Sequence, residues 1–215
     1  DPFDADRELT LSEALDKAAE GIEARFSARP DLSAQIRFGI GYSMYNRYRL
    51  EQADRQLARA LEESRAAFGT DDIRSLRVQD AIANLRLEQD RGREAEAGFR
   101  HVIARLESLQ LTDDPVYGNA MGKLGNLYLV QENYAQADAL LQQSKRWFDA
   151  HPDAPAKDRA NLLSNLAHAA HGLEDLVRAD ALYAQAHEAM QAVYPDGSPD
   201  QAVLLNNRAM LNEDR

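Results

Sequence analysis

The sequence predicts an all-α fold: a right-handed superhelical solenoid of antiparallel helix pairs, about ten helices in all. Three observations lead to this prediction. The 215 residues show no strand pattern, and apolar residues recur at helical spacing instead. Alanines on one predicted helix face recur at a constant interval, and small residues on the preceding helix recur at the same interval. A fixed period of this kind is typical of arrays in which each repeat packs on its neighbours.

The interval is 42 residues, and it connects four columns of the sequence. The first column contains only alanines: Ala53, Ala95, Ala137 and Ala179. The positions four and seven residues later are mostly apolar: Leu57, Phe99, Leu141 and Tyr183, then Ala60, Val102, Ser144 and Ala186. A small residue stands twelve positions before each alanine, with a fifth in register: Gly41, Ala83, Gly125, Ala167 and Ala209. The constant period favours a repeat array over a single generic helical bundle with small core residues.

The small column explains why Gly125 lies inside an apolar helical pattern, although glycine is a poor helix former. Two antiparallel helices cross closely only where one side chain is small. The small residue on the first helix and the alanine on the second are expected to allow that approach. Tyr128 and Tyr134 are then expected to fill the space beside the crossing.

The elements follow in order from the N-terminus. A packing helix is predicted within 10–31, where Thr10 and Glu13 form a capping-box pattern. Four repeats follow at 33–74, 75–116, 117–158 and 159–198, all in one domain, 1–215. Their first helices are predicted near 33–48, 72–89, 115–131 and 155–171, and their second helices near 50–67, 93–110, 134–150 and 174–193. The last helix, 199–213 within the segment 199–215, is either a cap or a truncated fifth repeat.

Turn residues agree with this division. Three X-Pro pairs, Asp114-Pro115, Ala154-Pro155 and Ser198-Pro199, place proline in the first turn of a helix, where its missing N–H is tolerated. Short turns inside the repeats are predicted at Gly92, Asn133 and Gly172. In the last helix, Arg208 and Asn212 replace mostly apolar residues of earlier repeats, as a solvent-facing cap would require.

At these columns the chain resembles the tetratricopeptide repeat family. The matching stretches are "IGYSM…LEQADRQLARAL", "IANLR…GREAEAGFRHVI", "KLGNLYLVQENYAQADALLQQS" and "NLAHAAHGLEDLVRADALYAQA". The 42-residue repeat is more similar to the longer variant of kinesin light chains than to the common 34-residue form. Some positions depart from the pattern, since Gly92 and Leu176 stand in the column of Tyr134, and Arg86 and Ala170 in that of Tyr128. The resemblance implies a protein-binding scaffold and specifies no partner.

The start of the chain, "DPFDADRELTLSEALDKAAEGIEARFSARPDLSAQIRFGIGYSM", carries a weaker resemblance. It is similar to the segment before the repeats of bacterial membrane-anchored Ser/Thr kinases and of winged-helix regulators. This resemblance implies the extracytoplasmic (periplasmic) or otherwise cytoplasmic regulatory part of a larger signalling protein. The absence of an initiator Met also suggests an excised fragment.

Composition restricts the kinds of partner. The net charge is −11, with 25 Lys and Arg against 36 Asp and Glu, which disfavours nucleic acid and favours basic or polar peptides. The chain contains no Cys, so disulfides and Cys-type zinc sites are excluded. No apolar run approaches the length of a membrane span, and no signal peptide is visible.

The first helices of such an array are expected to line a concave groove where a ligand lies. The positions expected to face it are Gln35, Phe38, Tyr42, Tyr45 and Asn46; Arg77, Asp80, Asn84 and Glu88; Asn119, Asn126 and Leu129; Asn161, Ser164, Asn165, His168 and His171; and Val203, Asn206 and Asn207. The many asparagines favour peptide binding, because each amide both donates and accepts hydrogen bonds. The family resemblance supports this role at Asn84, Asn126 and Asn165.

Alternatives remain for each group. The asparagines are equally able to bridge neighbouring helices or to face water. Tyr42 and Tyr45 could anchor an apolar partner side chain, or Tyr42 could pack against the N-terminal helix. Arg77 and Lys123 are too scattered to form a dense clamp for a terminal carboxylate. Trp147 is expected to seal a seam between repeats, or otherwise to belong to an outer contact patch, whereas Phe148 should be core.

His168 and His171 lie three residues apart on one helix face and could both reach a metal, but no third ligand has a fixed spacing. No phosphate-binding loop, nucleophile elbow or Cys nucleophile is present. We therefore expect no enzyme, no cofactor and no metal site. The leading hypothesis is a monomeric scaffold that binds an extended peptide or protein segment in its groove. The alternatives are a self-associating structural module and a metal- or small-molecule-responsive sensor that uses the two histidines.

Overall fold

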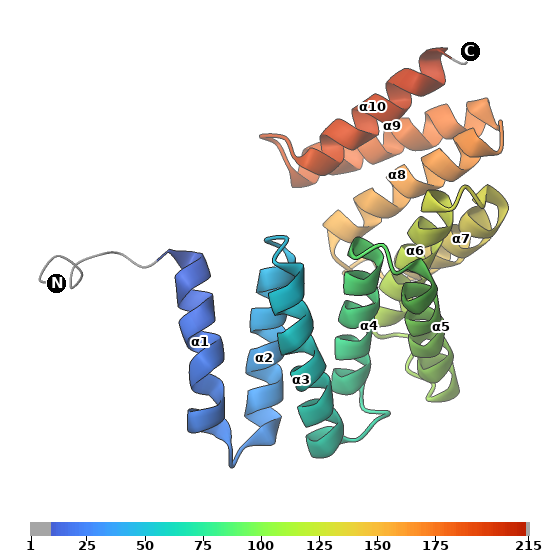
Figure 1. Cartoon of the computed structure of the whole chain (residues 1–215). Coiled ribbons are helices and arrows are strands. Elements are labelled where there is room, and N and C mark those ends of the chain that lie inside the picture. Colours follow the sequence, from blue (N-terminus) through green and yellow to red (C-terminus); the bar gives the residue numbers. More distant parts are fainter. Residues whose placement is uncertain (1–9, 214–215) are drawn as a thin grey trace, which may run out of the picture. The chain divides into compact units, whose positions relative to one another are not determined.

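A computed structural model describes residues 10–213, and every regular element in that range is an α-helix (Figure 1). The residues DPFDADREL, on which part of the second resemblance rests, lie outside the described range. The helices are α1 (Leu11–Phe26), α2 (Pro30–Tyr45), α3 (Leu50–Phe68), α4 (Ile73–Glu88), α5 (Gly92–Ser108), α6 (Pro115–Val130), α7 (Tyr134–Ala150), α8 (Ala156–Gly172), α9 (Leu176–Val193) and α10 (Pro199–Glu213).

The chain forms two compact units, Asp1–Gly98 (unit 1) and Phe99–Arg215 (unit 2), with the boundary inside α5. Unit 1 contains α1 to α4 and the start of α5, and unit 2 contains the rest of α5 and α6 to α10. In unit 1, each of α1 to α3 packs on the next helix, and in unit 2 each of α6 to α9 does so, in each case as antiparallel neighbours. The single domain and the repeat boundaries stay predictions.

Local sequence signals explain most helix ends. Thr10 and Glu13 form the predicted capping box: the Glu13 N–H donates to Thr10 Oγ1, and the Thr10 N–H donates to Glu13 Oε2. The helix predicted at 33–48 begins earlier and ends earlier, because Pro30 occupies its first turn and Asn46 is its C-cap. Pro115 lies in the first turn as predicted, whereas Pro155 is the N-cap of α8 and therefore just outside it.

The turns inside the repeats do not use glycine, contrary to prediction. Gly92 begins α5 and Gly172 ends α8, while Asn133 is the N-cap of α7. The left-handed residues are Tyr48, Asp90, Glu132 and Glu174, with φ between 56° and 61°. In each turn the next residue donates its N–H to a carbonyl five positions earlier, which satisfies an end carbonyl of the preceding helix. These four residues are also 42 positions apart, so the backbone repeats with the predicted period.

Close helix crossings occur at the small column in unit 1. A Cβ added to Gly41 would lie 2.9 Å from Leu57 Cγ, on the partner helix of the pair α2 and α3. On the next pair, a Cβ added to Gly98 would lie 2.8 Å from Ala83 Cβ. The core beside the first crossing contains Ile40, Met44, Leu57 and Leu85 with Ile22 from α1.

The same crossing recurs in unit 2 at Gly125. An added Cβ would lie 2.7 Å from Leu141 Cγ and 3.5 Å from the Ala137 carbonyl oxygen. The small column is thus confirmed at this position, but its nearest neighbour is the leucine four residues after the alanine. Tyr128 is buried beside this crossing, as predicted.

Trp147 is only 8% exposed. Its ring packs against Gly118 of α6, where no side chain larger than hydrogen fits. Its Nε1–H donates to the Thr112 carbonyl at 2.6 Å, and its ring stacks on His151 at 4.0 Å between centroids. By the predicted boundaries, Gly118 and His151 belong to the repeat of Trp147 and Thr112 belongs to the preceding repeat, so the side chain contacts both repeats, as expected for a seam residue. Phe148 is core, as predicted.

Helix α10 packs on α8 and α9 through its buried residues Leu204 and Leu211. Arg208 is half-buried with a nitrogen 3.9 Å from Asp180 Oδ1, and it therefore is not a solvent-facing cap residue. Asn212 is exposed, as predicted, but the outer face of this helix is not uniformly polar, because its exposed residues include large apolar ones: Val203, Leu205 and Met210. Ala209, the fifth member of the small column, is exposed as well.

Candidate functional site

In unit 1, the inward positions of α2 form a row of aromatic rings. The rings of Phe38 and Tyr42 have centroids 6.1 Å apart, and those of Tyr42 and Tyr45 are 5.9 Å apart and stacked. Tyr42 is 44% exposed, so its ring is available to a partner. Packing of Tyr42 against α1 stays a prediction.

Tyr45 connects this row to α4. Asn84 Nδ2 donates to the Tyr45 hydroxyl at 2.7 Å, and that hydroxyl lies 3.5 Å from Glu88 Oε1, to which it donates. Burial, followed by the charge of Glu88, raises the pKa of Tyr45 above its ordinary value, so the phenol stays protonated. For Asn84, the structure matches the alternative in which an asparagine bridges neighbouring helices. Asn46 and Arg77 are exposed.

In unit 2, several predicted inward residues surround one cavity of about 250 Å³. The cavity lies between α6, α8 and α10, with one residue from α9 at its base. Its lining residues are Asn126, Asn161, Ser164, Asn165, Met190, Asp200 and Val203. Five of these were predicted from their register alone: Asn126, Asn161, Ser164, Asn165 and Val203.

The amides of this cavity are unpaired. Among residues 10–213, Asn126, Asn161 and Asn165 have no hydrogen-bond partner. Asn119, about two turns before Asn126 on α6, is different because its Nδ2 donates to Asp158 Oδ2 at 3.1 Å. Three half-buried amides therefore present donors and acceptors to an open space, which is the arrangement that a peptide backbone requires.

The two histidines lie near the cavity on α8 but form no metal centre with neighbours. The ring of His168 lies 6.0 Å from that of Tyr134, and burial, then the nearby His171, lowers the pKa of His168. Between residues 10 and 213, no three His, Asp or Glu side chains are grouped in a way that would hold a metal ion.

One predicted groove residue, Leu129, is buried, whereas the groove positions of Asn206 and Asn207 stay predictions. Leu129 is 3% exposed and belongs to the core, because burial of an apolar side chain is favourable. Asn206 is exposed, with its amide 3.9 Å from the sulfur of Met210 on the same helix. Asn207 is half-buried.

Sequence reasoning missed the buried guanidinium of Arg37, which is only 2% exposed. Its Nε donates to Glu63 Oε1 at 2.9 Å, and its Nη1 donates to Gln56 Oε1 at 3.1 Å. A signal was present, because the residues 42 and 84 positions later, Gln79 and Met121, are also buried. A charged residue in a buried column indicates a polar network.

Comparison with solved structures supports the repeat fold. BtubC (BKLC) from P. vanneervenii superposes with a TM-score of 0.72 at 15% identity, covering 87% of this chain and 77% of the other. A Podospora anserina putative kinesin light chain with nearly identical TPR-like repeats gives 0.63 at 17% identity, covering 85% and 89%. Aspartyl phosphate phosphatase F from Bacillus subtilis gives 0.69 at 13% identity, covering 94% of this chain and 58% of the other.

The chain has a tetratricopeptide-repeat-like fold. At these identities the likeness establishes the fold and leaves the partner open. No protein-family model matches the sequence, and no curated protein matches it. None of the helices between residues 10 and 213 combines the length and the apolar character that a membrane span requires.

Proposed function

We propose that this chain is a non-enzymatic protein-interaction module that binds an extended peptide or protein segment at the amide-lined cavity of unit 2. The unpaired amides of Asn126, Asn161 and Asn165 carry the proposal. The TPR-like fold supports it, because folds of this kind serve as protein-binding scaffolds.

The chemistry of the cavity fits a peptide backbone. Each amide offers two N–H donors and a carbonyl acceptor, so three of them match alternating C=O and N–H groups without selecting a sequence. Val203 and Met190 add apolar surface for one small side chain. The carboxylate of Asp200 and the net charge of −11 favour a basic or polar segment.

A binding selection tests this site. Immobilised wild-type chain is screened against displayed random peptides, and the enriched peptides are measured against variants. The double variant Asn126→Ala, Asn165→Ala is expected to bind at least about tenfold more weakly, corresponding to one or two lost hydrogen bonds.

The matched control is Asn119→Ala, which removes the same group from α6 where the amide is already paired with Asp158. Binding should survive in this variant. Equal affinity for the wild type and the double variant would remove the cavity from the interaction surface.

The larger context of this module belongs to the proposal as well. The weaker resemblance at the N-terminus supports a sensor or docking part of a bacterial signalling protein, with a membrane segment or a regulatory domain next to it. The flanking coding sequence decides between these. A flanking segment with neither a membrane span nor a kinase or DNA-binding motif would contradict this role.

Self-association is a second candidate, favoured by the exposed apolar residues of α10: Val203, Leu205 and Met210. Contacts of this kind between copies are concentration-dependent. Light scattering from micromolar to millimolar concentration tests it. A constant monomer mass for the wild type would reject self-association and leave the peptide cavity unaffected.

A further inference from the structure

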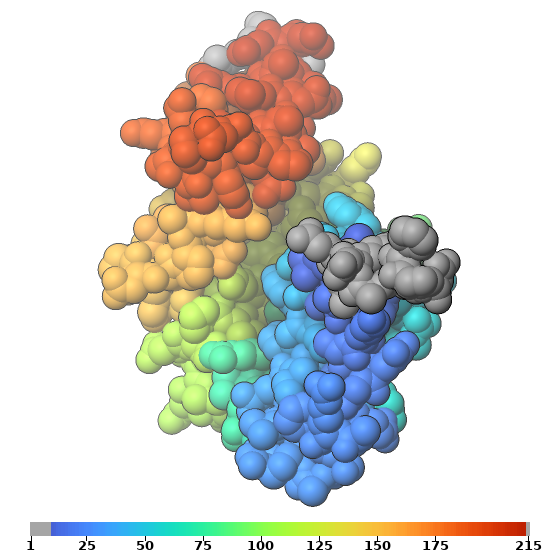
Figure 2. Space-filling view, turned by 90° about the vertical axis from the view of Figure 1, so that its left-hand side faces the viewer, coloured from blue at the N-terminus to red at the C-terminus, as the bar shows by residue number. Residues whose placement is uncertain are grey.

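Helix α1 packs on unit 1 with one buried apolar residue, Ile22, and three partly buried ones, Leu15, Ala19 and Phe26. Its residues Leu11, Leu15 and Ala18 fall in the columns whose members in α3 are fully buried. In α1, Leu11 is 55% exposed and Ala18 is exposed, and Ile22 is the one buried residue of this helix. Figure 2 shows α1, in dark blue, lying on the surface beside α2. Apolar burial therefore contributes less to holding α1 than to holding α3.

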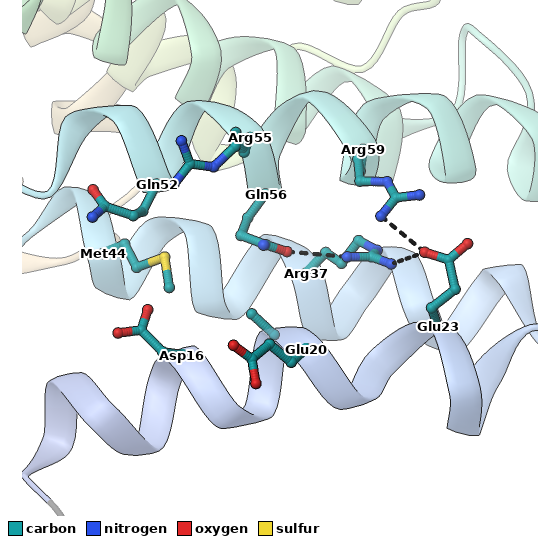
Figure 3. Close-up of a pocket in the computed structure, with 10 residues that line it drawn as sticks. Asp16, Glu20, Glu23, Arg37, Met44, Gln52, Arg55, Gln56 and Arg59 are labelled. Atoms are coloured by element: carbon teal, nitrogen blue, oxygen red, sulfur yellow. Dashed lines mark hydrogen bonds and ion pairs between the residues drawn. The ribbon is translucent and has the colours of Figure 1, made fainter.

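Polar contacts from three arginines supply much of the attachment. Arg49 Nη2 donates to Asp16 Oδ1 at 2.6 Å, and Arg49 Nη1 donates to the Ser12 carbonyl at 3.2 Å. Arg37 and Arg59 both reach Glu23, at 3.4 Å and 2.8 Å (Figure 3). The carboxylates lie on α1 and are about half to two-thirds exposed, so these pairs are screened by water and salt.

The contact between α1 and α3 is incomplete. A cavity of about 400 Å³ lies between them, over Arg37 and Met44 of α2 (Figure 3). Glu20 of α1 and Arg55 of α3 both line it, and neither has a partner within the described part of the chain. Unfilled space and charges that make no direct contact add little to the free energy that holds α1 in place.

The surface under α1 has a defined character. Ile40 and Met44 provide a buried apolar strip on α2, and the guanidinium groups of Arg37 and Arg49 flank it. Arg37 would keep Glu63 and Gln56 if α1 moved, whereas both hydrogen-bonded partners of Arg49 lie on α1.

The arrangement of acidic and apolar residues along α1 indicates which kind of helix can bind to this surface. Asp16 and Glu23 are seven residues apart and therefore lie on one helix face, next to the apolar residues Leu15, Ala19 and Ile22. An amphipathic helix with acidic residues at this spacing satisfies both the apolar strip and the arginines.

We infer that α1 is a displaceable cover, and that the α2 and α3 surface beneath it docks an acidic amphipathic helix from a partner protein. This site is distinct from the amide-lined cavity of unit 2. Displacing the cover exchanges its few contacts for those of the incoming helix, so the affinity for a partner depends on how firmly α1 is held.

The absence of cysteine allows a direct test. In the full-length variant Glu23→Cys, Arg59→Cys, a short bismaleimide linker ties α1 to α3, and the same protein with capped thiols leaves α1 free. The probe is a fluorescein-labelled peptide of residues 10–27. We expect the free form to bind the probe at least tenfold more tightly than the linked form.

One doubly substituted probe and one protein variant complete the design. The peptide with Asp16→Lys and Glu23→Lys should not bind, because it reverses the charges that meet Arg37 and Arg49. Adding Asn126→Ala and Asn165→Ala to the protein should leave probe binding unchanged, which separates this surface from the proposed peptide cavity. Equal binding of the linked and free forms, or no binding by the free form, would overturn the inference.

Hydrogen exchange on the wild-type chain gives an independent measurement. Amides of residues 11–26 are expected to exchange faster than those of 50–68, and faster still at 0.5 M salt, since salt screens the arginine contacts. Equal protection of the two helices at both salt concentrations would show that α1 is fixed and contradict its role as a cover.

Discussion

The inner helices of the two units use polar side chains in opposite ways. In unit 1, Asn84 and Tyr45 bind each other, and Glu88 completes the group. In unit 2, Asn126 and Asn165 face a cavity and have no partner among the described residues. Asn84 and Asn126 occupy the same column, 42 residues apart. One repeat position therefore supports stability in one unit and is free for binding in the other.

This difference has a physical consequence. A buried polar group that is paired contributes to stability, whereas an unpaired one costs free energy unless a ligand or water satisfies it. Substitutions at paired groups of unit 1 should lower stability, and substitutions at unpaired groups of unit 2 should lower binding or even raise stability.

The largest expected change in stability is the same in both units, so the smaller changes below can be compared with it. Gly41→Val and Gly125→Val each place carbon within about 3 Å of a leucine on the partner helix, so each should lower the free energy of unfolding by about 3 kcal/mol. Chemical denaturation followed by circular dichroism measures both.

The control for this prediction lies two residues from Gly41. A Cβ added to Gly39 meets nothing within 4 Å, so Gly39→Ala should raise stability by about 0.5–1 kcal/mol through helix propensity alone. If Gly125→Val were tolerated as well as Gly39→Ala, the close crossing would not constrain the fold.

The next expected change in stability differs between the two units. Tyr45→Phe removes the acceptor of Asn84, and it should lower stability by about 1 kcal/mol. The double variant Asn126→Ala, Asn165→Ala removes two amides from unit 2 and should change stability by less than about 0.5 kcal/mol, since no hydrogen bond is lost. A large loss in the double variant would show that these amides are structural, and the contrast between the units would disappear.

The sequence predicted the fold well because the signals that define it repeat. The 42-residue columns, the capping box at Thr10 and the proline at Pro115 each act locally or recur, so they can be read one position at a time. The turns were missed because the left-handed residues, such as Glu132 and Glu174, are not glycine and carry no local signal.

The candidate site was predicted only as a set of positions. Which asparagine is free depends on what lies opposite: Tyr45 has a hydroxyl within 2.7 Å of Asn84, whereas Asn126 faces the space below α10. That space is formed by Asp200 and Val203, which are far away in the sequence. The position of a residue in the repeat predicts which face of its helix it occupies. Whether its side chain is hydrogen-bonded depends on which groups the neighbouring helix places opposite, and the repeat pattern does not predict that.

A third effect extends the comparison to the core of unit 2. Tyr183 is fully buried in a column that is otherwise apolar, and its hydroxyl has no hydrogen-bond partner within the described residues. Burial raises the pKa of Tyr183 to about 12, so the group is neutral at every relevant pH. Tyr183→Phe should therefore raise stability by about 1 kcal/mol, the opposite sign to Tyr45→Phe. A loss of stability would show that the hydroxyl is satisfied, for example by water.

The smallest expected effect is a loss of stability at acidic pH. All five histidines lie beyond residue 98, so a titration near pH 6 reports on unit 2 alone. Burial, then His171, lowers the pKa of His168, which means that the unfolded chain binds the proton more tightly than the folded one.

The contribution of His168 to the free energy of unfolding is therefore complete above the pKa of histidine in the unfolded chain, about 6.5. It declines as the pH falls below that pKa. Unfolding curves between pH 7.5 and pH 5 should show a loss of stability that is smaller in His168→Asn, which cannot titrate. His171→Asn should also reduce the loss, because it removes a positive charge that disfavours the protonated ring of His168. A pH dependence that is identical in the wild type and His168→Asn would assign the titration to another group and show that folding leaves the pKa of His168 unchanged.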